Sequence, residues 1–406
     1  MKKLSEEQEM VIAILSAQLF HAQVKITKEI DWQSVCDEAI QQAVFPFVAL
    51  TAAPYLSSKK QSVAKKIFMS AIARNMQIDY EHAQLNELLT ANDIPYVILK
   101  GAASGFYYPE PILRMMGDVD FLIRESDFQR AGALLETAGF RSEKDSGGIH
   151  VGYHRTGSVW EMHRMANGVP AGIAGKRTKE YLSDIIDTAV TVKSSKGSYR
   201  IPDRFHHGLV LLLHTVSHMT SSGIGLRHLC DWAVFAASMS DREFCDVFEQ
   251  PLKEIGMWRF AQLLTLCAVH YLGCPAKTWA GEADEELLTA MICDILNSGN
   301  FGQKDADRYR QIKYIANRGE NTVDEKGPIR QVIHTMNRKV KAECSFVARH
   351  PVLLPAGWIF VGGTYLRLVF LGKRQLDSGK TIEAAKERKA IYQEFHLFET
   401  GGETFV

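Results

Sequence analysis

Two aspartates separated by one residue are the feature of this chain that points most directly to chemistry. Asp118 and Asp120 lie in Gly117-Asp118-Val119-Asp120-Phe121-Leu122-Ile123, whose apolar end is typical of a short buried strand. Side chains two apart on a strand point the same way, so both carboxylates emerge on one face. Two such anions repel unless a cation lies between them, and oxygen ligands suit Mg²⁺. We interpret the pair as a magnesium site with phosphoryl chemistry; the alternative is a turn with two solvated carboxylates.

A third carboxylate follows at Glu161, in Ser158-Val159-Trp160-Glu161-Met162-His163, which alternates as a strand. A lone glutamate on a strand is usually a solvated edge residue. Beside a metal-binding pair it becomes the natural further ligand, and it supplies a base for a nucleophile. His163 shares the face of Glu161 and is a candidate contact for the metal or for an acceptor.

A strand-to-helix turn is the third candidate element. Tyr96-Val97-Ile98-Leu99 is a short β-type run, followed by Lys100-Gly101 and then by small residues through Gly105. A glycine there lets the backbone approach a ligand, the N–H groups of a helix start attract phosphate oxygens, and a lysine adds positive charge. Lys-Gly turns are common, so this element depends on the other two for its meaning.

The elements that must position these residues form a small α/β unit over 93–200. After the aspartate strand, we expect Asp127 to cap a helix over 128–138 that ends at Gly139. An extended segment and the strand over 158–163 then complete the order strand–helix–strand–helix–strand–strand. This order predicts a mixed sheet.

Helical regions are expected on both sides of the sheet, so the predicted fold class is α+β. Residues 1–92 have apolar positions at helical spacing and form an N-terminal helical region. Residues 201–300 predict a helical bundle domain, and 301–406 a linker and a C-terminal helical region. The bundle helices are expected over 205–219, 226–238, 242–255, 258–271 and 285–296.

Composition excludes some classes of function. The chain has 406 residues with 47 basic and 47 acidic side chains, so no overall basic field holds nucleic acid, and we do not favour a nucleic-acid partner. The seven cysteines are single, without a CxxC pair, which favours reduced thiols in the cytoplasm over disulfides or a zinc site. The N-terminus lacks signal-peptide features. The uncharged stretch 351–365 is shorter than the roughly 20 residues that span a bilayer, so we interpret it as core or a partner surface rather than a peripheral membrane contact.

Four further residues are candidates for a groove or for phosphate binding. His214 and His218 lie four apart on an expected helix, a spacing that favours a polar groove or core histidines over a zinc site. Arg227 is a phosphate candidate, with an ion pair to Asp231 as the alternative. Arg114 is another, with a pairing to one of the two aspartates as its alternative.

Several of these motifs, in their order, resemble one known family. Leu99-Lys100-Gly101, Tyr108-Pro109, Arg114, the segment from Gly117 to Ile123, Ala138-Gly139-Phe140 and Glu161-Met162-His163 are similar to the uncharacterised nucleotidyltransferase family of the polymerase-beta-type superfamily. The resemblance covers about 93–165, and His214, His218, Leu226-Arg227 and Asp231 extend it into the following helices.

The resemblance implies a nucleotidyltransferase palm with flanking helices, acting through two-metal phosphoryl transfer. Asp118 and Asp120 would hold both metals, Mg²⁺ or Mn²⁺, while Glu161 would help to hold the catalytic metal and deprotonate the acceptor. The implied nucleotide-binding residues are Lys100, Gly101, Ser104, Arg114 and Gly117. One departure stands out: the wider superfamily carries Gly-Ser where this chain has Lys100-Gly101, with Ser104-Gly105 later.

The expected reaction moves an NMP from an NTP, ATP in our expectation, to an acceptor hydroxyl of a small molecule or a protein. His163, His214, His218 and Arg227 would line the acceptor or phosphate groove. Two alternatives remain at this point: a toxin-like enzyme that modifies tRNA, and an inactive nucleotide-binding or scaffold protein with the same fold.

Overall fold

The structure, a computed structural model, describes residues 3–26, 29–145, 148–170, 172–305, 308 and 379–399, with single positions at 340, 354, 357 and 358. The chain divides into two compact units, Met1–Arg308 with Ile391–Phe405, and Tyr309–Ala390 with Val406. The predicted linker after 301 and the apolar stretch 351–365 lie almost entirely outside the described residues. The predicted four-part domain division stays a prediction.

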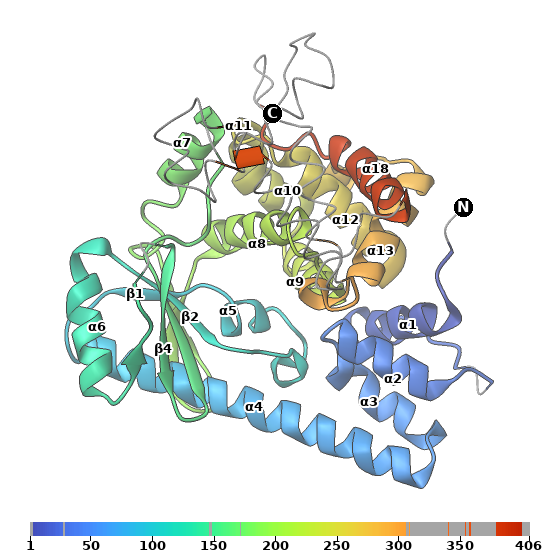
Figure 1. Cartoon of the computed structure of the whole chain (residues 1–406), viewed down its shortest axis with the longest axis horizontal. Coiled ribbons are helices and arrows are strands. Elements are labelled where there is room, and N and C mark those ends of the chain that lie inside the picture. Colours follow the sequence, from blue (N-terminus) through green and yellow to red (C-terminus); the bar gives the residue numbers. More distant parts are fainter. Residues whose placement is uncertain are drawn as a thin grey trace. The chain divides into compact units, whose positions relative to one another are not determined.

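The N-terminal region is helical, as predicted. Its helices are α1 (Glu6–Phe20), α2 (Trp32–Gln41), α3 (Phe45–Ala52) and α4 (Ser58–Thr90). Ser5 and Gln8 form a reciprocal capping box at the start of α1, and the Asp31 carboxylate accepts a hydrogen bond from the Gln33 backbone N–H at α2. The last of these helices is the single long helix α4, which runs from beside α3 past the sheet (Figure 1).

The sheet is mixed, as predicted, but it has one strand more than expected. Its order is β1-β2-β5-β4-β3, and only β2 and β5 pair in parallel. The strands are β1 (Tyr96–Ile98), β2 (Val119–Ile123), β3 (Arg141–Ser142), β4 (His150–Arg155) and β5 (Ser158–His163). The unexpected strand is β4, whose sequence His-Val-Gly-Tyr-His-Arg has a central glycine and no clean apolar alternation.

Short helices connect these strands. They are α5 (Ala102–Gly105), α6 (Phe128–Thr137) and α7 (Gly172–Tyr181), and a separate hairpin of β6 (Val190–Lys193) and β7 (Ser198–Ile201) follows. Gly139 ends α6 with φ +88° as expected. The prediction that Asp127 caps α6 was wrong in its detail, because the side chain makes no cap bond and instead pairs with Arg130 at 3.3 Å.

The region after 201 is a helical bundle whose helices closely match the predicted ranges. They are α8 (Arg204–Met219), α9 (Leu226–Ala237), α10 (Asp241–Phe244), α11 (Gln250–Glu254), α12 (Trp258–Leu272) and α13 (Glu285–Ser298). The helix predicted over 242–255 is interrupted by a π-helical turn at Cys245–Glu249. Pro251, two residues after this turn, lacks the N–H that an α-helical bond would need. Helix α18 (Gly379–Gln393) lies near the C-terminus.

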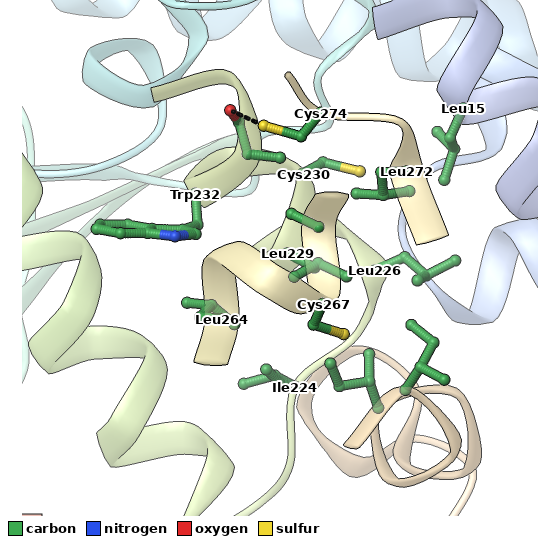
Figure 2. Close-up of a cluster of buried hydrophobic side chains, with 14 of the residues drawn as sticks. Leu15, Ile224, Leu226, Leu229, Cys230, Trp232, Leu264, Cys267, Leu272 and Cys274 are labelled. Carbon is green, nitrogen blue, oxygen red and sulfur yellow. Dashed lines mark hydrogen bonds between the residues drawn. The ribbon is translucent and has the colours of Figure 1, made fainter. Parts of the chain in front are cut away.

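One hydrophobic core joins the first three helices to the bundle. Leu15 of α1 belongs to the same buried cluster as Leu229 of α9 and Leu272 of α12 (Figure 2). Cys230, Cys267 and Cys274 lie in this core as free thiols. A second cluster packs α4 and α6 against the sheet. No helix in the described part of the chain is both long and apolar enough to cross a membrane.

Two polar side chains join distant segments of the fold, Gln42 within the bundle and Glu81 between α4 and the sheet. The fully buried Gln42, which follows α2, accepts a hydrogen bond from the Leu226 N–H at 3.0 Å and donates one to the Leu296 carbonyl at 2.8 Å. It therefore joins the first turn of α9 to the last turn of α13. Buried Glu81 of α4 accepts hydrogen bonds from the Ser158 hydroxyl at 2.6 Å and the Trp160 indole at 2.9 Å, which fastens β5.

Candidate active site

The parallel strand pair places the predicted carboxylates side by side. Asp120 of β2 lies opposite Glu161 of β5, and Asp118 immediately precedes β2. One ligand oxygen from each of these three residues lies within 4.8 Å of the other two. The residues next to them along each strand point to the other face of the sheet. Trp160 is one of these, and its indole donates a hydrogen bond to Glu81 there. The sheet register thus aims all three carboxylates at one point.

Asp120 is the most enclosed member of the cluster and has two partners. Its Oδ1 accepts from the Lys100 ammonium at 3.0 Å and lies 2.9 Å from His163 Nε2. Burial opposes the charged form, but Lys100 and His163 outweigh it and lower the pKa of Asp120. The same contacts overcome the burial of Lys100 and His163 and raise the pKa of both. Asp120 is therefore an anion in this arrangement.

Asp118 differs from Asp120 because it has no hydrogen-bond partner in the described part of the chain. Burial, followed by the negative charges of Asp120 and Glu161, raises the pKa of Asp118 to about 6. Like charges that are crowded and partly desolvated favour a bound proton or a bound cation. The Asp118 carboxylate is thus the position in the cluster where added positive charge would relieve the most repulsion.

Two histidines surround the third carboxylate. Glu161 Oε2 lies 3.5 Å from His163 Nε2 and 3.8 Å from His150 Nε2. The Glu161 side chain is 26% exposed and that of His163 only 2%, so the glutamate is the member that faces the open cavity. His150, Glu161 and His163 form a second group whose ligand atoms could share a metal ion.

The Lys100-Gly101 turn lies against the carboxylates. Gly101 has φ +52°, a region that residues with a side chain rarely adopt, and it begins the short α5. Ser104 of α5 is buried, and its hydroxyl has no partner among the described residues. The Gly117 carbonyl accepts a hydrogen bond from Arg74 at 2.5 Å, which holds the turn before Asp118. The nucleotide-binding roles of Lys100, Gly101, Ser104 and Gly117 stay predictions.

The partner of Arg114 is not the one the sequence indicated. Its Nε and Nη2 donate to the two carboxylate oxygens of Asp231, each at 2.7 Å, and the Tyr108 hydroxyl donates to the same carboxylate at 2.6 Å. The interpretation that Arg114 pairs with Asp118 or Asp120 is therefore wrong, and so is an ion pair between Arg227 and Asp231. The nucleotide-binding role of Arg114 stays a prediction, and its Nε and one Nη2 hydrogen are already used by Asp231.

The opposite wall of the site is built from α8 and α9. His214 and His218 of α8 face His228 of α9, with ring centroids 5.6 Å and 6.1 Å from that of His228. Arg227 donates from Nη1 to the Met115 carbonyl at 3.2 Å, and its Nε has no partner among the described residues. The groups with metal-ligand spacing in the described part of the chain contain none of these three histidines.

One cavity of about 490 Å³ contains the whole predicted site. Every predicted site residue lines it: Lys100, Gly101, Ser104, Arg114, Gly117, Asp118, Asp120, Glu161, His163, His214, His218 and Arg227. Sequence reasoning missed Phe301 and Asn167, which also line the cavity. The only signal for Phe301 was its place in Gly299-Asn300-Phe301-Gly302, since a phenylalanine between glycines marks a sharp turn with an aromatic side chain.

Comparisons with known proteins bear on this geometry. A model of the family described as "Uncharacterised nucleotidyltransferase" matches residues 28–273, which is more than half of the chain. A solved structure, that of an antigenic nucleotidyltransferase-like protein from Paracoccidioides brasiliensis, is similar over 48% of this chain and 92% of its own, at 15% identity and a TM-score of 0.30. No curated protein matches the chain significantly. On the strength of the family match, which contains the carboxylate cluster and the α8–α9 wall, the chain belongs to the uncharacterised nucleotidyltransferase family.

Proposed function

We propose that this protein is a metal-dependent enzyme that transfers a nucleoside monophosphate from an NTP to an acceptor hydroxyl and releases pyrophosphate. ATP with Mg²⁺ or Mn²⁺ is the proposed substrate pair, and the acceptor is a small molecule or a protein in the cytoplasm. The observation that carries the proposal is the convergence of Asp118, Asp120 and Glu161 in a cavity large enough for a nucleotide, in a chain of a nucleotidyltransferase family.

The donor set fits a hard divalent cation. Three carboxylates offer oxygens within 4.8 Å of one another, and Asp118 has no partner among the described residues to balance its charge. The Lys100 ammonium, 3.0 Å from Asp120, already compensates part of the negative charge. Held by these carboxylates, Mg²⁺ would neutralise phosphate charge and favour deprotonation of the acceptor.

The side chains of the protein have separate tasks in this proposal. Glu161, whose side chain is 26% exposed, accepts the proton of the acceptor hydroxyl, while His163 and His150 hold its orientation. The acceptor oxygen forms a bond to the α-phosphorus as the bond to the β-phosphate oxygen breaks, and pyrophosphate leaves. Lys100 and Arg227 supply positive charge at the cavity wall for the phosphate oxygens.

A screen of the four NTPs with Mg²⁺ or Mn²⁺ tests the proposal, with pyrophosphate release and self-labelling as the readouts. We expect release with at least one NTP and its loss when the metal is chelated. The key variant is Asp118→Asn, which changes a side chain without hydrogen-bond partners in the described residues and so should fold normally. It should lower the rate about a thousandfold, the effect of losing several kcal/mol of charge stabilisation.

The matched control is Asp246→Asn, which removes an exposed carboxylate whose side chain is 68% accessible and which does not line the cavity. It should release pyrophosphate at the wild-type rate. An Asp118→Asn protein that keeps the normal rate would contradict the assignment of the metal ligands. Absence of both NTP binding and turnover in the wild type would contradict the proposed function itself.

A further inference from the structure

The aromatic ring of Phe301 is presented to the cavity by an unusual backbone. Phe301 has φ +54° and ψ 35°, the left-handed region that a bulky residue rarely adopts. It lies between Gly299 and Gly302, with φ +65° and +74°, and its side chain remains 40% exposed at the cavity. An apolar ring held in a strained conformation and left in contact with solvent is not explained by packing.

The ring is surrounded by flat polar groups. The Phe301 centroid lies 4.7 Å from that of His218 and 5.2 Å from that of His228, and the Arg227 guanidinium lies over the ring at 5.3 Å. His228 is 3% exposed, and neither of its ring nitrogens has a partner in the described residues. His228 itself lines the cavity, so it carries hydrogen-bonding capacity there that no described residue uses.

These imidazoles are neutral rather than cationic. Burial lowers the pKa of His228 and His214 well below the ordinary value and that of His218 to about 4. A neutral imidazole offers one donor and one acceptor, whereas phosphate binding calls for positive charge. The positive charge of Lys100 contributes to the lowered pKa of His214 and His218, so this wall lies close to the carboxylate cluster.

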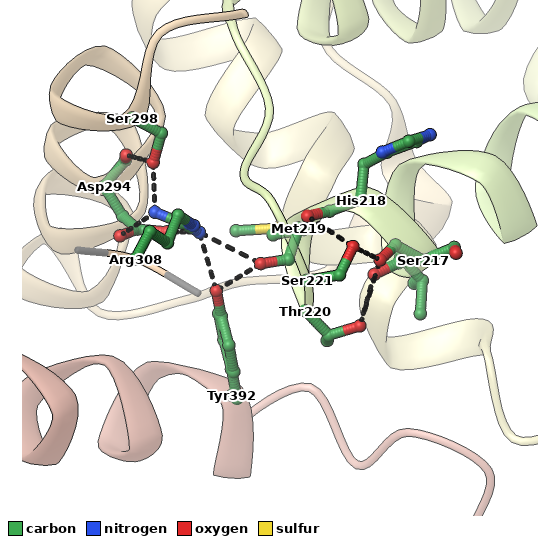
Figure 3. Close-up of polar contacts among 10 residues, drawn as sticks. Ser217, His218, Met219, Thr220, Ser221, Asp294, Ser298, Arg308 and Tyr392 are labelled. Atoms are coloured by element: carbon green, nitrogen blue, oxygen red, sulfur yellow. Dashed lines mark hydrogen bonds and ion pairs between the residues drawn. The ribbon is translucent and has the colours of Figure 1, made fainter. Parts of the chain in front are cut away.

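The loop that carries Phe301 is firmly anchored. Buried Arg308 donates to the Asp294 carboxylate at 3.0 and 2.9 Å and to the Met219 carbonyl at 2.9 Å, and the Tyr392 hydroxyl contacts both Arg308 and Met219 (Figure 3). A Cβ on Gly302 would lie 2.3 Å from the Ser222 carbonyl oxygen, so the loop fits closely against the end of α8. The ring is therefore a fixed platform.

We propose that Phe301, His228 and the neighbouring imidazoles form the subsite that binds the nucleobase of the NTP. The inference rests on the proposed function, which places the phosphates at the carboxylate cluster of the same cavity. A nucleobase has a flat π-face for stacking and an edge of donors and acceptors for neutral imidazoles. Arg227 lies against the ring and completes the stack through its guanidinium.

The test compares binding of the four NTPs with binding of inorganic tripolyphosphate, by calorimetry with Mg²⁺ and no acceptor. The wild type should bind at least one NTP about tenfold or more tightly than tripolyphosphate, the contribution of one stacked base. The variant Phe301→Gly removes the ring and also relieves the positive φ, so the fold is preserved. It should weaken NTP binding about 5- to 150-fold and leave tripolyphosphate binding unchanged.

Two further variants complete the design. Phe301→Tyr keeps the ring and should bind NTP like the wild type. Phe106→Ala removes a phenylalanine that is 57% exposed but does not line the cavity, and it should have no effect.

Four outcomes would overturn the inference. Equal weakening of both probes by Phe301→Gly would mean that the residue acts on the phosphates or on the fold. Unchanged NTP affinity would also refute the base assignment, including the case in which only the KM for an acceptor rises. If the wild type binds tripolyphosphate and NTP equally well, this inference fails while the proposed function stands; if it binds neither, both fail.

Discussion

The two walls of the cavity are both polar and enclosed, yet they are prepared for opposite kinds of group. On the sheet wall, Asp120 is ion-paired with Lys100 and hydrogen-bonded to His163, and these two partners overcome burial and lower the pKa of Asp120. On the α8–α9 wall, burial alone accounts for most of the lowered pKa of His228, and its nitrogens have no partner in the described residues. The sheet wall is suited to charged ligand groups, and the α8–α9 wall to flat, neutral ones.

Two arginines that line this cavity differ in the same way, one paired with a carboxylate and the other not. Arg114 is fully committed to Asp231 by a bidentate ion pair that Tyr108 reinforces. Among the described residues, the Arg227 side chain donates one hydrogen bond, to a backbone carbonyl, and burial lowers its pKa. Arg114 therefore stabilises the fold, whereas Arg227 retains a donor and a charge that can bind a ligand.

The largest effect should come from the sheet wall. Asp120→Asn removes the charge that balances Lys100 and His163, and we expect pyrophosphate release to fall about a thousandfold. Steady-state kinetics measure the loss, and circular dichroism checks that the sheet is retained. If the rate of pyrophosphate release fell by less than about tenfold, the sheet wall would not be the wall that carries out the proposed reaction.

The arginine pair gives the next largest effect, on stability. Arg114→Met leaves the buried Asp231 carboxylate without its cation, so the free energy of unfolding should fall by about 3–5 kcal/mol. Arg227→Met leaves no carboxylate unpaired and should change it by less than about 1 kcal/mol. Urea unfolding of both variants measures the difference. Equal destabilisation would show that Arg227 is as structural as Arg114.

A smaller effect is expected in the loop that carries Phe301. Gly302→Ala should lower the free energy of unfolding by about 1–3 kcal/mol, because φ is +74° and the new Cβ meets the Ser222 carbonyl. The matched control is Gly139→Ala, at φ +88° with no atom within 4 Å, which should cost about 1 kcal/mol from backbone strain only. Thermal unfolding compares the two. Equal losses would mean that the loop is not tightly fitted.

The smallest effect is the pH dependence of two histidines on one helix. Although burial opposes it, the hydrogen bond that His206 donates to the Asp203 carboxylate and the charges of Asp203 and Asp184 raise the pKa of His206. The stabilisation by His206 is therefore present below its unfolded pKa and lost as pH rises through its folded pKa. His206→Gln should therefore cost more stability at about pH 5.5 than at about pH 8.5, by less than about 1 kcal/mol because both aspartates are partly exposed.

His218, with its pKa lowered to about 4, should show the opposite sign. At mildly acidic pH the unfolded chain binds a proton at this position that the folded chain does not, so His218→Gln should gain relative stability there. Urea unfolding at both pH values measures each variant. Two histidines with the same sign would mean that α8 does not change from a charged to a neutral environment along its length.

The parts of this molecule that were predictable depend on local periodicity. The aspartate pair, Glu161 and the helices of the bundle all follow from spacing along a strand or a helix, and they fold as that spacing requires. Strand β4 was not predictable, because Gly152 interrupts its pattern and only pairing with β5 makes it a strand. Local reasoning offered only Arg227, four residues away, as an alternative partner for Asp231, whereas its partner Arg114 is 117 residues away.

The same limit applies to Phe301, which lies beyond the bundle in a stretch predicted as a linker. Its role depends on contacts with α8 and α9 that no window of neighbouring residues contains. What a sequence of this kind conveys well is the chemistry of the sheet wall, where the residues are near one another in the chain. The second wall is assembled from distant segments, and only the folded arrangement reveals it.

The amide of Gln42 has a consequence for attempts to make a smaller protein. The amide accepts a hydrogen bond from a backbone N–H of α9 and donates one to a backbone carbonyl of α13. A glutamate could only accept and a lysine could only donate, so neither could make both bonds. Deleting the first 57 residues would strip the segments bearing Arg227 and Phe301 of their common brace. A shortened protein that begins at α4 would therefore lack the side chain that joins α9 to α13.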